Sequence, residues 1–200
     1  MRGFPRSLPL RGLQRVRRPT THGVSSLKAA YERVARAVGL SPMEVGACYR
    51  ARKRKLMPGA FTNKHYVAMT MLDETEAQLE ERIRKLVGDA NALHKDIDGR
   101  KRFAYYHTRY SVRSVEGWPD DVLLDRKECI LYIWENKRET ESPGPEQTNW
   151  LNDLGMIAAL TENVVMLGVI RPSNYDSLYD VLDISKYMGR DGPHTDLPAP

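Results

Sequence analysis

The chain has 200 residues, the size of one domain or of one domain with a small appendage. Its two cysteines, Cys48 and Cys129, exclude a disulfide scaffold and a cysteine-rich zinc site, and they favour a reducing compartment. The longest apolar run, residues 164–170, is far shorter than the roughly 20 residues of a membrane-spanning helix, so we expect no membrane contact.

The net charge of +5 conceals an uneven distribution. Residues 1–70 contain 15 Lys and Arg against 2 Asp and Glu, whereas residues 71–200 contain 16 against 24. A basic arm on an acidic body suggests attachment to a polyanion together with a function that needs carboxylates. The arm is equally compatible with a disordered or targeting segment.

Residues 1–25 contain six Arg, three Pro and no acid, and are not expected to form a core. An Arg-rich, acid-free start resembles an organellar transit peptide, but no apolar face with helical spacing supports that interpretation. No secretory signal fits either. The expected location is therefore the cytoplasm of a bacterial or virus-infected cell, with organellar targeting still open.

Two helices are predicted after this start. Residues 26–38 have the apolar spacing of an amphipathic helix, which Gly39 ends. Ser41, Pro42 and Glu44 supply an N-cap, a first-turn proline and a capping-box acid for a second helix that runs to about Leu56. The basic end of that helix contains the candidate DNA-binding residues Arg50, Arg52, Lys53, Arg54 and Lys55. The pair resembles half of a helix-turn-helix DNA reader or a solvated helical hairpin, and a third helix is not evident.

The predicted organisation has three parts. Residues 1–68 form a basic arm with a disordered start and a helical hairpin, residues 69–188 form a folded domain, and residues 189–200 form a disordered tail. Met69 and Met71 lie just before a strong helix start. If translation begins there, residues 1–68 are dispensable.

The folded domain is predicted to be α/β, with a small mixed sheet flanked by helices. The expected helices cover residues 75–90, 145–160 and 173–183, and the expected strands cover residues 103–108, 122–124, 129–137 and 164–170.

Acidic and basic side chains meet at one edge of this predicted sheet. Asp120 follows a turn at the start of a strand, while Glu135 and Lys137 share one face of the next strand. Pairing the two strands brings Asp120 and Glu135 together, and two close carboxylates are usually stabilised by a divalent cation. A lysine beside such a cation can orient water or offset charge on a phosphate. The more ordinary alternatives are a Pro-Asp turn and a strand that simply reaches solvent.

Glu76 adds a third acid. It projects from the middle of the apolar face of the helix at residues 75–90, so it either frays into solvent or points at something inside.

These residues resemble a known family, the VRR-NUC (virus-type replication-repair nuclease) domain of the PD-(D/E)xK nuclease superfamily. Six segments occur in the family's order: Glu76, then His-Thr-Arg-Tyr-Ser at 107–111, Gly-Trp-Pro-Asp at 117–120, Glu-Asn-Lys at 135–137, Gln147 with Trp-Leu at 150–151, and Arg-Pro at 171–172.

The resemblance implies a role for each matching residue. Asp120, Glu135 and the backbone carbonyl of Asn136 would bind the catalytic Mg²⁺ or Mn²⁺, and Lys137 would position water or the scissile phosphate. Glu76 would complete the acidic cluster, and Gln147 would brace the site. The residues implied to contact the DNA backbone are His107, Arg109, Ser111 and Arg113.

The implied protein is a metal-dependent, structure-selective DNA endonuclease with a restriction-endonuclease-like core. It would act as a homodimer on branched DNA such as Holliday junctions. The alternative is a non-catalytic DNA-binding protein that uses the basic helices of residues 26–56. The chain departs from the family at Asp121 and Asn136, where apolar residues are usual, so which of Asp120 and Asp121 faces the metal stays open. The connection over residues 88–102 is also longer than expected.

Overall fold

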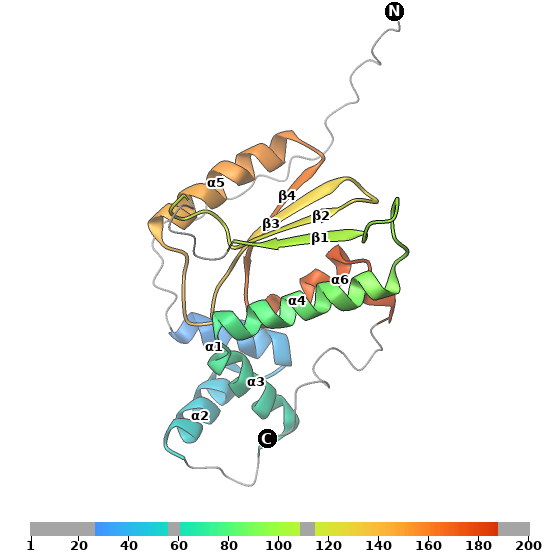
Figure 1. The fold of residues 1–200 in the computed structure, drawn as a ribbon. Helices are drawn as coiled ribbons and strands as arrows, with labels where there is room; N and C mark the ends of the chain where they lie inside the picture. Colours follow the sequence, from blue (N-terminus) through green and yellow to red (C-terminus); the bar gives the residue numbers. More distant parts are fainter. Residues whose placement is uncertain (1–26, 56–60, 109–114, 188–200) are drawn as a thin grey trace, which may run out of the picture.

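The computed structural model of the chain describes residues 27–55, 61–108 and 115–187 (Figure 1). The predictions for residues 1–25 and 189–200 lie outside these ranges. The α-helices are α1 (Leu27–Val38), α2 (Pro42–Lys53), α3 (Asn63–Asp73), α4 (Glu76–Leu93), α5 (Pro145–Leu160) and α6 (Ser177–Val181). The strands are β1 (Phe103–His107), β2 (Asp121–Asp125), β3 (Ile130–Asn136) and β4 (Val164–Ile170), and two 3₁₀ turns are η1 (Pro172–Asn174) and η2 (Ser185–Tyr187).

The four strands form one mixed sheet in the order β1-β2-β3-β4. The β1–β2 and β2–β3 pairs are antiparallel, and α5 crosses over so that β4 pairs parallel to β3. The register of β3 and β4 shifts once, because Met166 lies opposite Ile133 and Gly168 lies opposite Trp134. Gly168 lies at this bulge and has a φ of +79°, a backbone conformation that glycine adopts readily because it has no Cβ.

Helices cover both faces of the sheet, with α4 and α6 on one side and α5 on the other (Figure 1). The main core lies under the first face. It includes Leu79, Ile83, Leu86, Val87 and Ala90 of α4, Leu123, Trp134 and Ile170 of the strands, and Leu178 and Leu182 near α6. The predicted α/β class, with a small mixed sheet between helices, is confirmed. None of the described helices is long and apolar enough to cross a membrane.

Several predicted boundaries differ from the structure. The helix expected to end at residue 90 continues to Leu93, which shortens the connection to β1. The second helix ends at Lys53 rather than near Leu56. The helix predicted over residues 173–183 is instead the turn η1 followed by the short helix α6, and η2 lies beyond its predicted end.

The N-terminal part contains a third helix, α3, that the sequence analysis missed. Ala68, Met71 and Leu72 of α3 are buried against α1 and α2, so the predicted two-helix hairpin is a three-helix unit. The boundary expected between residues 68 and 69 falls inside α3, where the side chains on both sides of it are buried. The helix is hard to predict because its apolar face is defined only by contact with α1 and α2.

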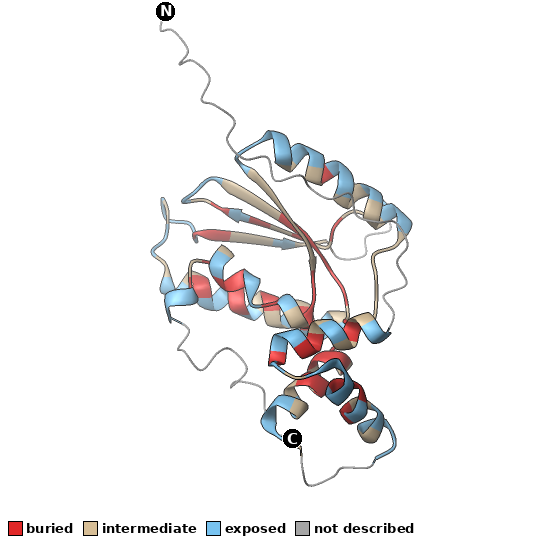
Figure 2. Ribbon diagram, turned by 180° about the vertical axis from the view of Figure 1, so that it is seen from behind, coloured by how far each residue is buried: buried red, intermediate tan, exposed pale blue. Residues whose placement is uncertain are grey.

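The three-helix unit, meaning α1, α2 and α3, is docked on the rest of the fold. Helices α1 and α3 pack against η1, whereas α2 lies on the side away from the sheet (Figures 1 and 2). Arg33 of α1 also reaches Glu139, a fully buried residue just after β3, with 3.2 Å between Arg33 Nε and Glu139 Oε2. An ion pair with a buried partner therefore joins the two parts.

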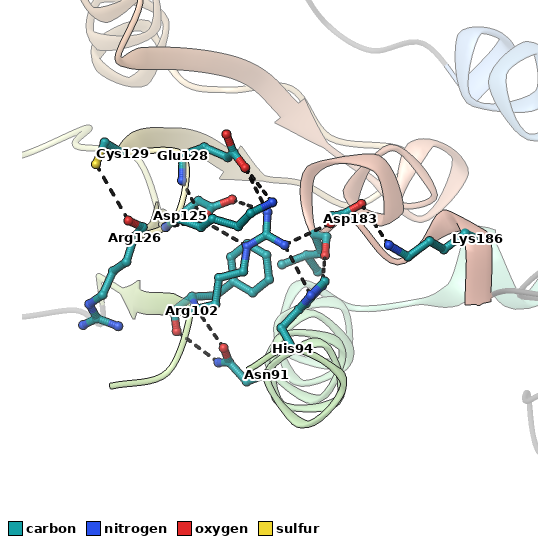
Figure 3. A network of polar contacts seen from close by, with 12 residues as sticks. Asn91, His94, Arg102, Asp125, Arg126, Glu128, Cys129, Asp183 and Lys186 are labelled. Carbon is teal, nitrogen blue, oxygen red and sulfur yellow. Dashed lines mark hydrogen bonds and ion pairs between the residues drawn. The ribbon is translucent and has the colours of Figure 1, made fainter. Parts of the chain in front are cut away.

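A buried polar network holds the end of the sheet where β1 begins (Figure 3). Arg102 Nε and Nη2 donate to the two carboxylate oxygens of Asp125, at 3.1 and 2.8 Å, and Arg102 Nη1 donates to Asp183 Oδ2 at 3.0 Å. His94 completes the network, with Nδ1 3.3 Å from Arg102 and Nε2 3.0 Å from the carbonyl of Leu182. Because a guanidinium only donates, His94 accepts at Nδ1 and carries its proton on Nε2. This network fixes the end of the sheet opposite the candidate site.

Candidate active site

The candidate site lies where β3 ends and β2 begins. The antiparallel pairing of β2 and β3 puts Asp120, the residue before β2, beside the end of β3. The backbone N–H of Asn136 donates to Asp120 Oδ2 at 2.9 Å. Residues 15 or 16 positions apart in the chain thus meet at one edge of the sheet, as the hairpin pattern predicted.

Glu135 is the centre of the site and is completely buried. Its Oε1 accepts from Lys137 Nζ at 2.7 Å and from Gln147 Nε2. Lys137 Nζ also donates to Glu76 Oε1, at 3.1 Å. The other oxygen, Glu135 Oε2, is buried and receives no hydrogen bond from any residue that the structure describes. Side chains from β3, α4 and α5 therefore form one cluster with an unsatisfied carboxylate oxygen inside it.

Glu76 and Gln147 are each positioned by the first turn of a helix. Glu76 is the first residue of α4, which is capped by Thr75, whose hydroxyl accepts from the backbone N–H of Gln78 at 3.2 Å. Gln147 Oε1 accepts from the backbone N–H of Gly144 at 2.9 Å, which leaves its amide nitrogen to face Glu135. Glu76 is half-exposed but paired with Lys137, so it points toward the site rather than fraying into solvent.

The cluster opens into a pocket of about 440 Å³. Its lining combines polar groups with an apolar wall: Glu76, Thr108, Val115, Glu116, Gly117, Trp118, Asp120, Lys137, Gly144, Glu146 and Gln147. The Trp118 ring packs edge-on against Trp150, 4.8 Å between centroids, and Trp150 Nε1 donates to the carbonyl of Glu116 at 3.2 Å. These contacts hold the turn that precedes Asp120 against α5.

Replacing Gly117 by Ala is expected to lower the free energy of unfolding by about 2–4 kcal/mol, because two costs add. Its φ is +79°, and a Cβ would lie 2.5 Å from the backbone carbon of Glu146. Gly99→Ala is the matched control, because Gly99 has a φ of +73° but open space around it, so only the backbone strain of about 1–2 kcal/mol applies. Denaturant unfolding compares the two, and equal losses would contradict the predicted close contact at Gly117.

The structure separates the two adjacent aspartates. Asp120 lines the pocket, whereas Asp121 is fully buried on the other side of β2. Asp121 accepts from the Tyr105 hydroxyl at 2.6 Å, from His107 Nδ1 at 2.7 Å and from the side-chain amide of Asn136. The contacts of Asp121 with Tyr105, His107 and Asn136 were not predicted, because no local pattern identifies which polar side chains meet across three strands.

His107, which the family resemblance implies contacts the DNA backbone, lies in a strand, as predicted for residues 103–108. It is the last residue of β1, with Nδ1 on Asp121 and Nε2 3.1 Å from Glu80 Oε2. The hydrogen bond to Asp121 raises the pKa of His107. Since both ring nitrogens are engaged inside the protein, His107 is a poor contact for DNA. Arg109, Ser111 and Arg113 lie outside the described residues.

The basic end of α2 is not brought to the pocket. Its exposed side chains are Arg50, Arg52, Lys53, Arg54 and Lys55. Arg52 and Lys53 pair with Asp73 of α3, at 3.2 and 3.8 Å, and α2 is the helix farthest from the sheet (Figure 1). A DNA contact there would be separate from the candidate site.

Burial disfavours the ionised forms of the carboxyl groups in the site. Burial, and next the charge of Asp120, raise the pKa of Glu135 to about 7. Burial also raises the pKa of Asp120, although the Asn136 N–H and Lys137 act in the other direction. Burial lowers the pKa of Lys137, but Glu135 and Glu76 outweigh it, so the net shift is upward. Lys137 is therefore an ammonium ion beside two carboxyl groups.

These features fit a divalent cation held by few protein ligands. Within the described ranges, no group of three or more His, Cys, Asp or Glu side chains is arranged to hold a metal ion. Mg²⁺, however, is commonly bound through one or two carboxylates, with waters and substrate phosphates completing the shell. The buried, unsatisfied Glu135 Oε2 beside Asp120 suits that role.

Mn²⁺ affinity is expected to rise as pH increases through about 7. The raised pKa means that Glu135 is protonated below that pH, and a carboxyl group must lose its proton before it binds a cation. Isothermal titration calorimetry at about pH 5.5 and about pH 8.5 measures the change. Glu135→Gln is the control, and an equally steep pH dependence in that variant would assign the titration to another group.

In comparisons with known proteins, no family model matches the chain, and no curated protein and no solved structure matches it either.

Proposed function

We propose that this chain is a metal-dependent nuclease with a PD-(D/E)xK core, of the VRR-NUC type, that hydrolyses phosphodiester bonds in DNA. The observation that carries the proposal is the cluster of Asp120, Glu135 and Lys137 at the pocket, with a buried carboxylate oxygen left unsatisfied. The spacing of these residues in the sequence is the spacing that the family resemblance requires.

Asp120 and Glu135, with the backbone carbonyl of Asn136, would hold Mg²⁺ or Mn²⁺. Such a cation would supply a Lewis acid for the phosphate and would lower the pKa of a water bound to it. Lys137, kept charged by Glu135 and Glu76, would offset the charge that develops on the phosphate. Gln147 fixes the Glu135 carboxylate from the helix side.

The charge of the pocket supports a need for cations. Glu76, Glu116, Asp120 and Glu146 line it, against the single ammonium of Lys137 among the described residues. Such a surface repels a phosphodiester until divalent cations neutralise it. The metal would therefore be needed for substrate entry as well as for the chemistry.

Branched DNA, such as a Holliday junction, is the proposed substrate, and a homodimer is the proposed assembly, acting in the cytoplasm. Cutting two strands of a two-fold symmetric junction needs two active sites, which a symmetric pair of chains provides.

The test is cleavage of end-labelled DNA with Mg²⁺, Mn²⁺ or EDTA. The substrates are a four-way junction, a flap, a nicked duplex and a linear duplex, and the proteins are the wild type, Asp120→Ala and Lys137→Ala. Metal-dependent cutting of branched substrates that both variants lose is the expected result. Salt-sensitive binding without scission in any metal would instead support a DNA-binding protein that uses the basic end of α2.

A further inference from the structure

Asp121 is a buried carboxylate that the proposed chemistry does not use. It is fully buried, on the face of β2 that also carries the core residue Leu123. Burying a carboxylate is costly, and an apolar residue at a core position avoids that cost. The burial of Asp121 is therefore a cost in stability that the proposed chemistry does not explain.

The partners of Asp121 connect it to the site. One oxygen accepts from Tyr105 and His107 of β1, and the other accepts from the side-chain amide of Asn136. Asn136 stands between Glu135 and Lys137 in the sequence, and its backbone N–H donates to Asp120. A single residue of β3 is therefore held by Asp121 on one side and holds Asp120 on the other.

The same network reaches the helix that carries Glu76. His107 binds Glu80 of α4 through Nε2, and Arg84 pairs with Glu80. Asp121 thereby links β1, β2, β3 and α4, and the last three of these, or the residues at their ends, provide acids of the candidate site. The linkage sets the spacing of these elements where the carboxylates converge.

We propose that Asp121 is a positioning residue. It fixes Asn136, whose backbone N–H in turn holds Asp120 in the geometry that binds the metal. This inference rests on the proposed function. Replacing a residue that hydrogen-bonds to a metal ligand and orients it typically lowers metal affinity or activity by about 10- to 100-fold.

The first variant is Tyr105→Phe, which removes one hydroxyl from Asp121 on the side away from Asn136. Mn²⁺ affinity, measured by calorimetry, and single-turnover cleavage are expected to fall about 10-fold. Tyr106→Phe is the matched control, because Tyr106 is the next residue of β1 and its side chain is exposed. It should match the wild type in both measurements.

The decisive test exchanges the two groups that face each other. Asn136→Asp places a second carboxylate against Asp121, so metal affinity and cleavage should fall about 10- to 100-fold. Adding Asp121→Asn restores one donor and one acceptor in reversed positions. The Asn oxygen at position 121 can still accept from Tyr105 and His107. The double variant should therefore recover to within a few-fold of the wild type.

The assays are run below the melting temperature of every variant. Asn136→Asp with wild-type activity would overturn the proposal, and so would a folded double variant as slow as the single one. A wild type that cuts DNA while this pattern fails removes only the positioning role of Asp121. A wild type that neither binds Mn²⁺ nor cuts DNA removes the proposed function and this inference with it.

Discussion

Lys137→Ala is expected to slow single-turnover DNA cleavage by about 100- to 1,000-fold, the range found when one preorganised charge-stabilising group is removed from an active site. Lys137 Nζ is the cation between Glu135 and Glu76, at 2.7 and 3.1 Å. Without it, charge that develops on the phosphate loses the stabilisation that this ammonium would provide beside the metal ion. Mn²⁺ affinity should be retained or increased, because the variant leaves the acidic cluster more negative.

Slower cleavage with retained or increased metal affinity distinguishes this prediction from simple misfolding, which would lower both. Lys101→Ala is the control, because Lys101 is an exposed lysine paired with Asp96 at 3.1 Å, near the other end of β1. Its cleavage rate should equal that of the wild type. If Lys137→Ala cut DNA as fast as the wild type, the candidate site would be wrongly assigned.

The site could be predicted where its geometry follows from short-range rules. Alternation along one strand puts Glu135 and Lys137 on the same side, and their 2.7 Å contact agrees. Hairpin pairing of β2 with β3 brings Asp120 to the same edge. Both rules need only the positions of a turn and two strands.

Longer-range contacts could not be predicted in the same way. Asp121 has its partners on two neighbouring strands, so its direction depends on the register of both. Arg33 and Glu139 are separated by 106 positions, and nothing local in either segment indicates the other. Helix α3 is defined in the same manner by the two helices that bury it. The residues missed are thus those whose roles arise from tertiary contacts.

The pairing of Arg33 with Glu139 carries the second large prediction, a loss of stability in Arg33→Ala. Glu139 is fully buried, with Oε1 on the backbone N–H of Ser173 at 2.7 Å and Oε2 on Arg33. Removing one partner of a buried ion pair costs about 3–5 kcal/mol, and the partial exposure of Arg33 places the expected loss near the lower end, about 3 kcal/mol. Urea unfolding of the full chain measures it. Arg36→Ala, an exposed arginine one turn along α1, should stay within about 0.5 kcal/mol of the wild type.

The same contact decides whether residues 1–68 are dispensable. A chain that begins at Met69 lacks α1 and α2 and divides α3, which uncovers Met71 and Leu72 and removes Arg33 from Glu139. Because Glu139 follows Lys137 by two residues, the segment that carries the site's lysine loses its support from α1. We expect the truncated chain to be less stable than the Arg33→Ala variant and to cleave more slowly. A truncated chain with the unfolding midpoint and the cleavage rate of the full chain would show instead that the three-helix unit is an independent appendage.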